Sequence, residues 1–408
     1  MPKPHCIEIN SVITVFKSKK MKKRLTNIPA LIAIALLLFT SGSLRAQKLY
    51  FPDTEWETRT PEQMNMNRMW LDSAVKYVMA NESKTEKDLR IAILRGYGRE
   101  PFFEIVGPVK PRGGPAGLII KGGYIVASWG DIDRVDMTFS VTKSFLSTMA
   151  GIALDDGLIR DINDKVNKYV WDDKFEGEHN SKITWLHLLQ QTSDWSGTLW
   201  GIHDWADRPP SRGGIDDWKN RTLNEPGTRY KYNDVRVNLL AYSLLHVLRE
   251  PLPVVLKNRI MDPIGASTTW RWHGYENSWV NIDGVMMQSV SGGGHFGGGL
   301  FISAADQARF GLLFLRDGNW NGKQLLSKEW VNSVTRTSEA NRTYGYMWWT
   351  NTGTPWKGVP ESVYHADGFG GNYIVVDKEN DLVVVVRWID SPRMGEFMSL
   401  VVKAATQK

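Results

Sequence analysis

The chain is almost without cysteine. Cys6 is the only one among 408 residues, and it lies in a segment that we expect to be removed from the mature protein. The mature domain then has no disulfide, no thiolate nucleophile and no cysteine-based metal site. It also has no cysteine directly after the apolar N-terminal segment that could take a lipid.

Long apolar runs are also missing. The run from Ile28 to Phe39 is too short for a comfortable membrane span. It follows the basic stretch that begins at Met21, and Ala46-Gln47 offers a plausible cleavage point. This order predicts a signal peptide over residues 1–46, with Met21 as the true start and a mature chain from about Gln47. We therefore expect an exported protein, periplasmic or secreted, with no stable membrane anchor after cleavage.

The mature chain has no basic excess. The whole sequence carries a formal charge of +6, but residues 1–46 hold eight Lys or Arg and one acidic residue, which leaves −1 for residues 47–408. A domain with that balance has no electrostatic attraction to nucleic acid. We expect no nucleic-acid partner.

Hydrophobic periodicity predicts an α/β (α+β) domain over residues 47–408. Its expected helices are an amphipathic helix within 48–83, a buried helix from Phe139 to Leu154, helices at 183–191, 238–248 and 304–315, and a tail from 393 to 406. Its expected strands are 91–94, 102–106, 117–120, 124–129, 372–377 and 382–388. Both chain ends then join one antiparallel sheet flanked by helices, and residues 158–345 form an inserted, largely helical subdomain. The glycine-rich loop 292–299 lacks the Lys-Ser/Thr of a phosphate loop and is expected to be structural or to line a cleft.

Two Ser-x-x-Lys tetrads occur. Ser73 and Lys76 fall in the middle of the first amphipathic helix, where we expect two solvated polar side chains. Ser140 and Lys143 instead lie where extended chain changes to helix, so the ammonium falls near the hydroxyl on one helix face. A helix N-terminus also favours the alkoxide and the oxyanion formed on attack. Lys143 can accept the proton of Ser140 or keep a second base in the right charge state.

The segment MTFSVTKSFLSTMAGIALDDGLI resembles the nucleophile helix of the class C β-lactamase, DD-peptidase and esterase family. Five further segments agree in order: ITWLHLLQQTSDWSG, PGTRYKYND, GGGLFISAADQARFGLLFLRDG, YGYMWW and ADGFGGNYIVVD. The resemblance covers about residues 90–390. It implies the β-lactamase/transpeptidase-like fold, with penicillin-binding-protein-like relatives and nylon-oligomer hydrolases, and an acyl-enzyme on Ser140 without cofactor or metal.

The resemblance also implies a base for Ser140. Its Tyr-x-Asn segment aligns with Tyr232 and Asp234, while a slipped register would select Tyr230. A phenol with a pKa near 10 needs the neighbouring Lys143 ammonium to lower it. An aspartate at position 234 cannot donate to a substrate carbonyl, but it can pair with Lys143 and keep it protonated.

The segment that aligns with the third motif of the family departs most from the family pattern. Ala366-Asp367-Gly368 stands where Lys-Thr-Gly or His-x-Gly is usual, and His365 is one residue out of register, on the opposite strand face. No cation is then expected to meet the carboxylate of a β-lactam or a D-Ala-D-Ala peptide. The backbone N–H of Phe369 can still complete an oxyanion hole with that of Ser140. The sequence therefore favours a small-molecule ester or amide substrate over β-lactams.

Several alternatives stay open. β-Lactamase or DD-peptidase activity, and a penicillin-binding sensor that acylates without turnover, fit the same motifs. A Ser-His-Asp hydrolase lacks its Gly-x-Ser-x-Gly elbow, and a zinc enzyme lacks HExxH spacing among His179, His187 and His203. His295 is expected to be structural. A pocket for the acyl group of the substrate would be lined by tryptophans, although most tryptophans are expected in the core. The candidates include Trp195, Trp200, Trp205, Trp348 and Trp349.

Overall fold

The computed structural model describes residues 49–407. The predicted signal peptide lies outside these residues. Within them no single helix has the length and apolarity to cross a bilayer; the helices Asp234–Leu248 and Leu252–Met261 reach that length only as a pair bent by 74°.

A six-stranded antiparallel sheet forms one half of the domain, in the order β11-β12-β13-β14-β1-β2. The strands are β1 (Ala116–Lys121), β2 (Tyr124–Trp129), β11 (Trp349–Thr350), β12 (Tyr364–Gly368), β13 (Asn372–Asp377) and β14 (Leu382–Arg387). The pairing of β1 with β14 joins the early hairpin to the late strands, which confirms that both ends of the described chain build one sheet.

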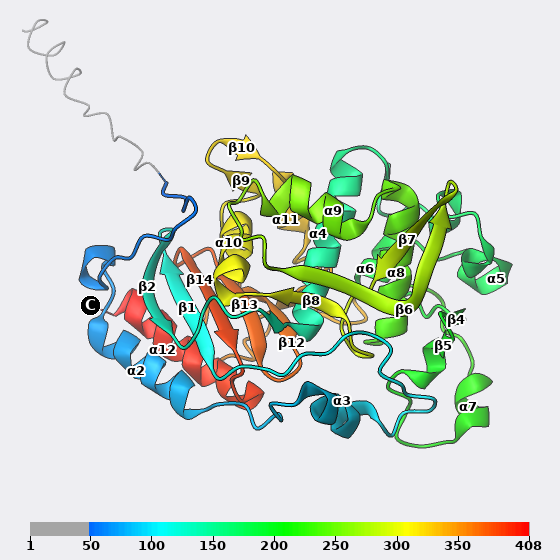
Figure 1. The fold of residues 1–408 in the computed structure, drawn as a ribbon, viewed down its shortest axis with the longest axis horizontal. Coiled ribbons are helices and arrows are strands. Elements are labelled where there is room, and N and C mark those ends of the chain that lie inside the picture. The colour runs from blue at the N-terminus through cyan, green and yellow to red at the C-terminus, as the bar shows by residue number, and fades with distance from the viewer. Residues whose placement is uncertain (1–48, 408) are drawn as a thin grey trace, which may run out of the picture. The chain divides into compact units, whose positions relative to one another are not determined.

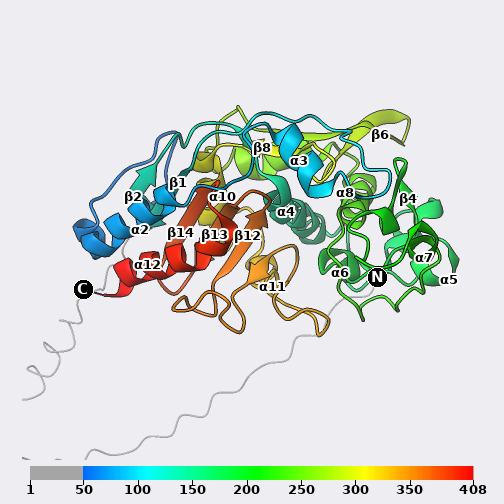
Figure 2. The same ribbon diagram turned by 90° about the horizontal axis from the view of Figure 1, so that it is seen from below.

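Helices cover both faces of this sheet. The helices α2 (Arg68–Ala80) and α12 (Met394–Thr406) lie side by side on the outer face, as the blue and red helices of Figures 1 and 2 show. The inner face meets α10 (Ala304–Leu315) and, beyond it, α4 (Thr142–Asp155). The rings of Phe145 and Phe310 stack with centroids 3.8 Å apart, which fixes α4 against α10 in the main core. The predicted α/β class with helices flanking an antiparallel sheet is confirmed.

The second half of the domain surrounds α8 (Asp234–Leu248). It also contains a four-stranded sheet in the order β3-β8-β6-β7, which the expectation of a largely helical insert did not include. These strands are β3 (Asp136–Met137), β6 (Arg271–Ile282), β7 (Val285–Val290) and β8 (Gly299–Ile302). The shorter elements are α5 (Gly177–Asn180), α6 (Trp185–Leu189), α7 (Ile215–Lys219), α9 (Leu252–Leu256), α11 (Lys328–Ser333), β4 (Thr198–Leu199), β5 (Ile202–His203), β9 (Asn319–Trp320) and β10 (Lys323–Gln324).

Two strand predictions are wrong. Residues 91–94 belong to α3 (Leu89–Tyr97), which begins at the side-chain cap of Asp88 and buries Leu89, Ala92 and Ile93. The alternation of Ile and Ala over four residues therefore reflects one helix face. Residues 102–106 have no regular secondary structure, and Phe102 adopts a positive φ of 56°.

Candidate active site

Ser140 lies at the turn that leads from β3 into α4. The preceding Phe139 has a φ of 50°, a conformation that non-glycine residues adopt rarely, and its ring is buried against Phe369 and Trp388. This turn continues as a 3-10 helix over Phe139–Val141 and then as α4. Packing around Phe139 therefore holds a strained backbone in place, and the Ser140 side chain, which is only half-buried, faces a cavity.

Lys143 joins Ser140 to Asp234. The Nζ atom of Lys143 donates to Ser140 Oγ at 2.8 Å and to Asp234 Oδ1 at 2.7 Å. The side chains of Lys143 and Asp234 are 2% and 1% exposed, so water does not screen this ion pair. Burial lowers the pKa of Lys143, while Asp234 opposes that effect. Against the burial penalty, Lys143 and Arg208 hold the pKa of the Asp234 carboxyl below its usual range.

Tyr232 lies over this pair. Lys143 Nζ stands 4.6 Å from the centroid of the Tyr232 ring, and Tyr232 lines the same cavity as Ser140. Burial raises the pKa of Tyr232 well above its ordinary value, and only part of that rise is offset by Ser140 and Arg208. The expectation that Lys143 brings this pKa down is therefore not met in the free protein. Tyr230 lies in the same cavity, but within residues 49–407 its buried hydroxyl has no hydrogen-bond partner, whereas Lys143 and Arg208 both approach the ring of Tyr232.

The glycine-rich loop has a specific part in this arrangement. A Cβ atom on Gly293 would overlap both Asp234 Oδ1 and Lys143 Nζ. Glycine at this position lets the loop backbone close over the ion pair and exclude water from it. The loop therefore has a structural role, which was one of the two interpretations of its sequence: it packs against the buried ion pair and is not among the residues that line the cavity around Ser140.

Arg208 is the main site residue that the sequence did not reveal. Its Nη1 atom donates to Asp207 Oδ1 at 2.6 Å and to Asp234 Oδ2 at 2.8 Å. The guanidinium carbon is 5.2 Å from the centroid of the Tyr232 ring. The side chain is 28% exposed and lines the cavity beside Ser140. A cation is therefore present at this cavity, although no cation occupies the third motif on β12.

The third motif forms the opposite wall. Gly368 packs so closely that a Cβ atom there would overlap Thr138 O and stand 3.3 Å from Ser140 N. Phe369 follows Gly368 and also lines the cavity, which has a volume of about 540 Å³. Burial raises the pKa of Asp367 to about 7, with Tyr373 and Lys143 acting against it. Asp367 is thus a wall carboxyl that titrates near neutral pH.

The other residues considered from the sequence lie away from Ser140. His365 is buried and stacks on Trp356 with centroids 4.1 Å apart, and burial lowers its pKa to about 3. Ser73 donates to the backbone carbonyl of Met69 on α2, as expected for a solvated tetrad. Of the five named tryptophans, Trp349 lines the cavity around Ser140. Trp195 and Trp348 are in the core, Trp200 packs on Tyr275, and Trp205 stacks on His203.

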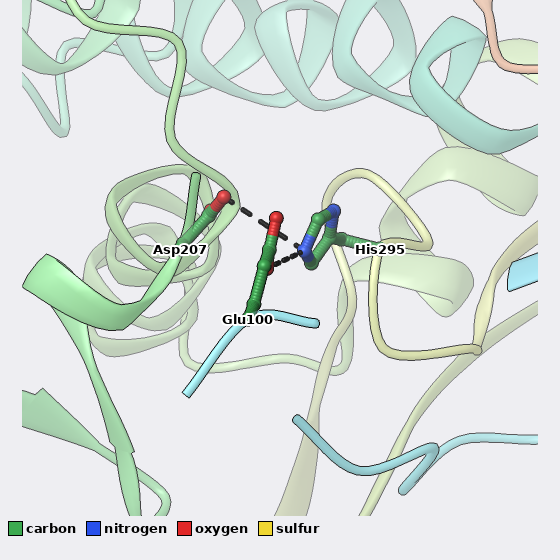
Figure 3. A group of neighbouring side chains, drawn as sticks. All are labelled: Glu100, Asp207 and His295. Atoms are coloured by element: carbon green, nitrogen blue, oxygen red, sulfur yellow. Dashed lines mark hydrogen bonds and ion pairs between the residues drawn. The ribbon is translucent and has the colours of Figure 1, made fainter. Parts of the chain in front are cut away.

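His295 belongs to a buried polar cluster behind Asp234. Figure 3 shows a ring nitrogen of His295 directed at Glu100 and Asp207; the Nε2 distances are 2.7 and 3.8 Å. Within residues 49–407 these three are the one group of His and acidic side chains close enough to share a metal ion. Asp207 Oδ1 already accepts from Arg208, and Asp207 Oδ2 accepts the backbone N–H of Asp234. The cluster is thus connected as a charge network that supports Asp234. His179, His187 and His203 each have other partners.

Comparison with known proteins identifies the family. A family model described as Beta-lactamase matches residues 119–394, which is more than half of the chain. The fold and the Ser140 site therefore define a serine hydrolase of the β-lactamase type, and the chain belongs to the beta-lactamase family.

Individual relatives are distant. A Salmonella agona protein named "Putative D-alanyl-D-alanine carboxypeptidase" is 22% identical over 347 residues, which cover 66% of this chain and 77% of that protein. A solved structure of a β-lactamase-like protein from Bacteroides dorei has a TM-score of 0.54 at 18% identity and covers 78% of this chain and 98% of its own. A family VIII carboxylesterase has a TM-score of 0.52 at 16% identity, with coverage of 79% and 98%. The structural similarities establish the fold.

Proposed function

We propose that this protein hydrolyses esters or amides of small molecules through an acyl-enzyme on Ser140. The observation that carries the proposal is the position of Lys143 Nζ, which contacts both Ser140 Oγ and a buried carboxylate. Attack by Ser140 on the substrate carbonyl requires transfer of the hydroxyl proton to the pair formed by Lys143 and Tyr232. The phenolate form of Tyr232 accepts this proton during attack, and the phenol so formed gives the same proton to the leaving group. Burial raises the pKa of Tyr232, so the phenolate is the minor form in the free protein, with the Lys143 ammonium 4.6 Å from its ring centroid as the neighbouring positive charge.

The oxyanion of the tetrahedral intermediate is assigned to two backbone amides. The N–H groups of Ser140 and Phe369 flank the cavity, and the close approach of Gly368 to Ser140 N supports this pairing. Backbone donors that are already in position cost no reorganisation during the reaction. Water then attacks the acyl-enzyme and releases Ser140.

Esters or amides are favoured over β-lactams because the third motif carries Ala366 and the carboxyl of Asp367 in place of a cation. Asp367 on β12 would repel a β-lactam carboxylate once it ionises, and Ala366 contributes no charge. The structural similarity to a family VIII carboxylesterase agrees with ester hydrolysis. The name of the Salmonella relative refers to a D-Ala-D-Ala carboxypeptidase, so peptide cleavage is the competing outcome. Export to the periplasm or medium is part of this proposal and rests on the predicted signal peptide.

The decisive experiment compares wild type with Ser140→Ala on four substrates: a short-chain p-nitrophenyl ester, a chromogenic cephalosporin, a D-Ala-D-Ala peptide and a linear amide oligomer. Ser140→Ala should lower kcat/KM by roughly 10³-fold or more on the preferred substrate. Ser73→Ala is the matched control, since Ser73 belongs to the other tetrad and lies on α2. Undiminished hydrolysis by Ser140→Ala would refute the proposal. Labelling of Ser140 by a fluorophosphonate without turnover of any substrate would indicate a sensor.

A further inference from the structure

A second cavity adjoins the one that contains Ser140. It has a volume of about 470 Å³, and both cavities are lined by Arg208 and Tyr230. Its remaining walls come from α7, from the loops on either side of it and from Asp194, in the region where Figure 1 places α7 below β5. The two cavities therefore adjoin at the side chains of Arg208 and Tyr230, and a substrate bound at Ser140 can extend toward the second cavity.

This second cavity is basic. Its ionisable residues are Arg208, Arg212, Arg221, Arg229, Lys231, Asp194 and Asp217, together with the phenol of Tyr230. Arg208 is neutralised by Asp207 and Asp234, and Arg221 by Asp194 and Asp204. In the described part of the chain, Arg212, Arg229 and Lys231 have no ion-pair partner. Three uncompensated cations therefore stand against one carboxylate, that of Asp217.

Lys231 is the most constrained of these cations. Its backbone N–H donates to Gln191 O at 3.0 Å, which holds it next to Tyr232 in the chain. Burial, with a smaller contribution from Arg236 and Arg221 and against nearby carboxylates, lowers the pKa of Lys231 to about 8. A partly buried ammonium with no carboxylate partner is stabilised when an anionic group binds beside it. The cavity is thus prepared for an anion rather than for an apolar group.

We propose that this basic cavity binds a carboxylate of the substrate while the scissile ester or amide bond lies at Ser140. The assignment rests on the proposed hydrolase function and adds a substrate class to it: esters or amides that bear a carboxylate some distance from the reacting carbonyl. The cation that β12 lacks is replaced by cations on the α7 side of the site. Arginine suits this role because its planar fork donates two parallel hydrogen bonds to a carboxylate.

Two matched ester pairs test the proposal. The first pair is p-nitrophenyl hexanoate and the p-nitrophenyl half-ester of adipic acid, which differ by a carboxylate at the end of the acyl chain. The second is phenyl butyrate and 3-carboxyphenyl butyrate, which differ in the leaving group. Wild type should prefer the carboxylate-bearing member of at least one pair in kcat/KM. Arg212→Gln and Arg229→Gln should each reduce that preference by about 10-fold and leave the neutral ester within about twofold.

Two control variants sharpen the result. Arg160→Gln changes an exposed arginine outside the basic cavity and should leave the preference unchanged. Asp217→Asn should increase the preference, because it removes the opposing charge while its amide oxygen can still accept from Gly214 N. Added salt should weaken the preference in wild type.

The proposal is overturned if wild type treats both members of both pairs alike, or if Arg212→Gln and Arg229→Gln slow neutral and charged esters equally. Failure of the hydrolase function gives a different result, namely no Ser140-dependent turnover of the neutral esters. In that case calorimetry on Ser140→Ala still tests the cavity. Tighter binding of the adipic half-ester than of the hexanoate, weakened by Arg212→Gln, would support it, and equal binding would exclude it.

Discussion

Replacement of Asp234 by asparagine tests the electrostatic basis of the site most directly. The asparagine side chain has nearly the same size but lacks the charge that neutralises Lys143 at 2.7 Å and Arg208 at 2.8 Å. Asp207 would still pair with Arg208, but among residues 49–407 Lys143 would keep no carboxylate within ion-pair distance. Since Lys143 is almost completely buried, the variant must either hold an unpaired ammonium or release its proton.

The expected cost is large. Removal of one partner from a buried ion pair costs about 3–5 kcal/mol, against a total free energy of unfolding of about 5–15 kcal/mol for a domain. The cost should depend on pH in a defined direction. The folded-state pKa of Asp234 lies below its unfolded value of about 3.9, so its contribution is complete above that value and disappears as pH falls through the folded pKa. The stability difference between wild type and Asp234→Asn should therefore shrink in acid.

Urea unfolding of wild type, Asp234→Asn, Lys143→Met and the double variant measures this coupling. Lys143→Met removes the buried ammonium, so Asp234→Asn should cost less in that background than in wild type. The difference should be at least about 2 kcal/mol at neutral pH, with the pH–rate profile of Asp234→Asn shifted as well. Additive effects of the two substitutions, or unchanged unfolding and an unchanged pH–rate profile in Asp234→Asn, would refute the reasoning.

Three further predictions concern the walls of the site. Gly293→Ala should destabilise the fold by about 1–3 kcal/mol and abolish activity, because the added Cβ displaces Lys143 and Asp234. Gly114→Ala is the control, since its Cβ would stand in open space, and it should change neither stability nor activity. Thermal unfolding and the ester assay measure the two effects. Asp367→Asn should remove a fall in kcat/KM as pH rises through about 7, since the ionised carboxyl opposes the oxyanion; a fall that persists in the variant would contradict this. Tyr232→Phe should lower kcat by about 10²–10⁴-fold in the same assay, and an equal loss from Tyr230→Phe would contradict the assignment of the base to Tyr232.

The pattern of apolar residues predicted the elements whose apolar positions recur regularly or form a continuous run. α2 buries one helical face, whereas α4, β13 and β14 are buried almost throughout and were recognised as apolar segments of helical or strand type; the structure confirms all four. The prediction failed for α3, because a run of four apolar residues is too short to distinguish the helical repeat from the strand repeat. It also missed β6, whose buried positions alternate only in part because a bulge between Gly274 and Trp279 breaks the register.

The site was predictable to the extent that its parts are local in the chain. Ser140 and Lys143 lie three residues apart on one turn, so sequence alone brings them together, and the pairing of Lys143 with Asp234 was inferred from a motif departure. Arg208 gave no such signal. It follows a short 3-10 helix, has a φ of 48° and reaches Asp234 across 26 positions of the chain, so only the folded loop shows its role.

The position of Arg208 also changes what the third motif means for this protein. The alanine at position 366 indicated that the third motif offers no positive charge to a substrate carboxylate, and β12 indeed has no lysine or arginine. The site nevertheless keeps two cations around Tyr232, since Lys143 and Arg208 both approach its ring, and further cations extend from Arg208 into the basic cavity. Because Arg208 is tied to Asp207 and Asp234, it cannot serve as a freely mobile ligand for substrate. In the proposed substrate class, anion recognition is assigned to Arg212, Arg229 and Lys231, which have no ion-pair partner among residues 49–407. A preference for charged over neutral esters is therefore the property that tests this assignment.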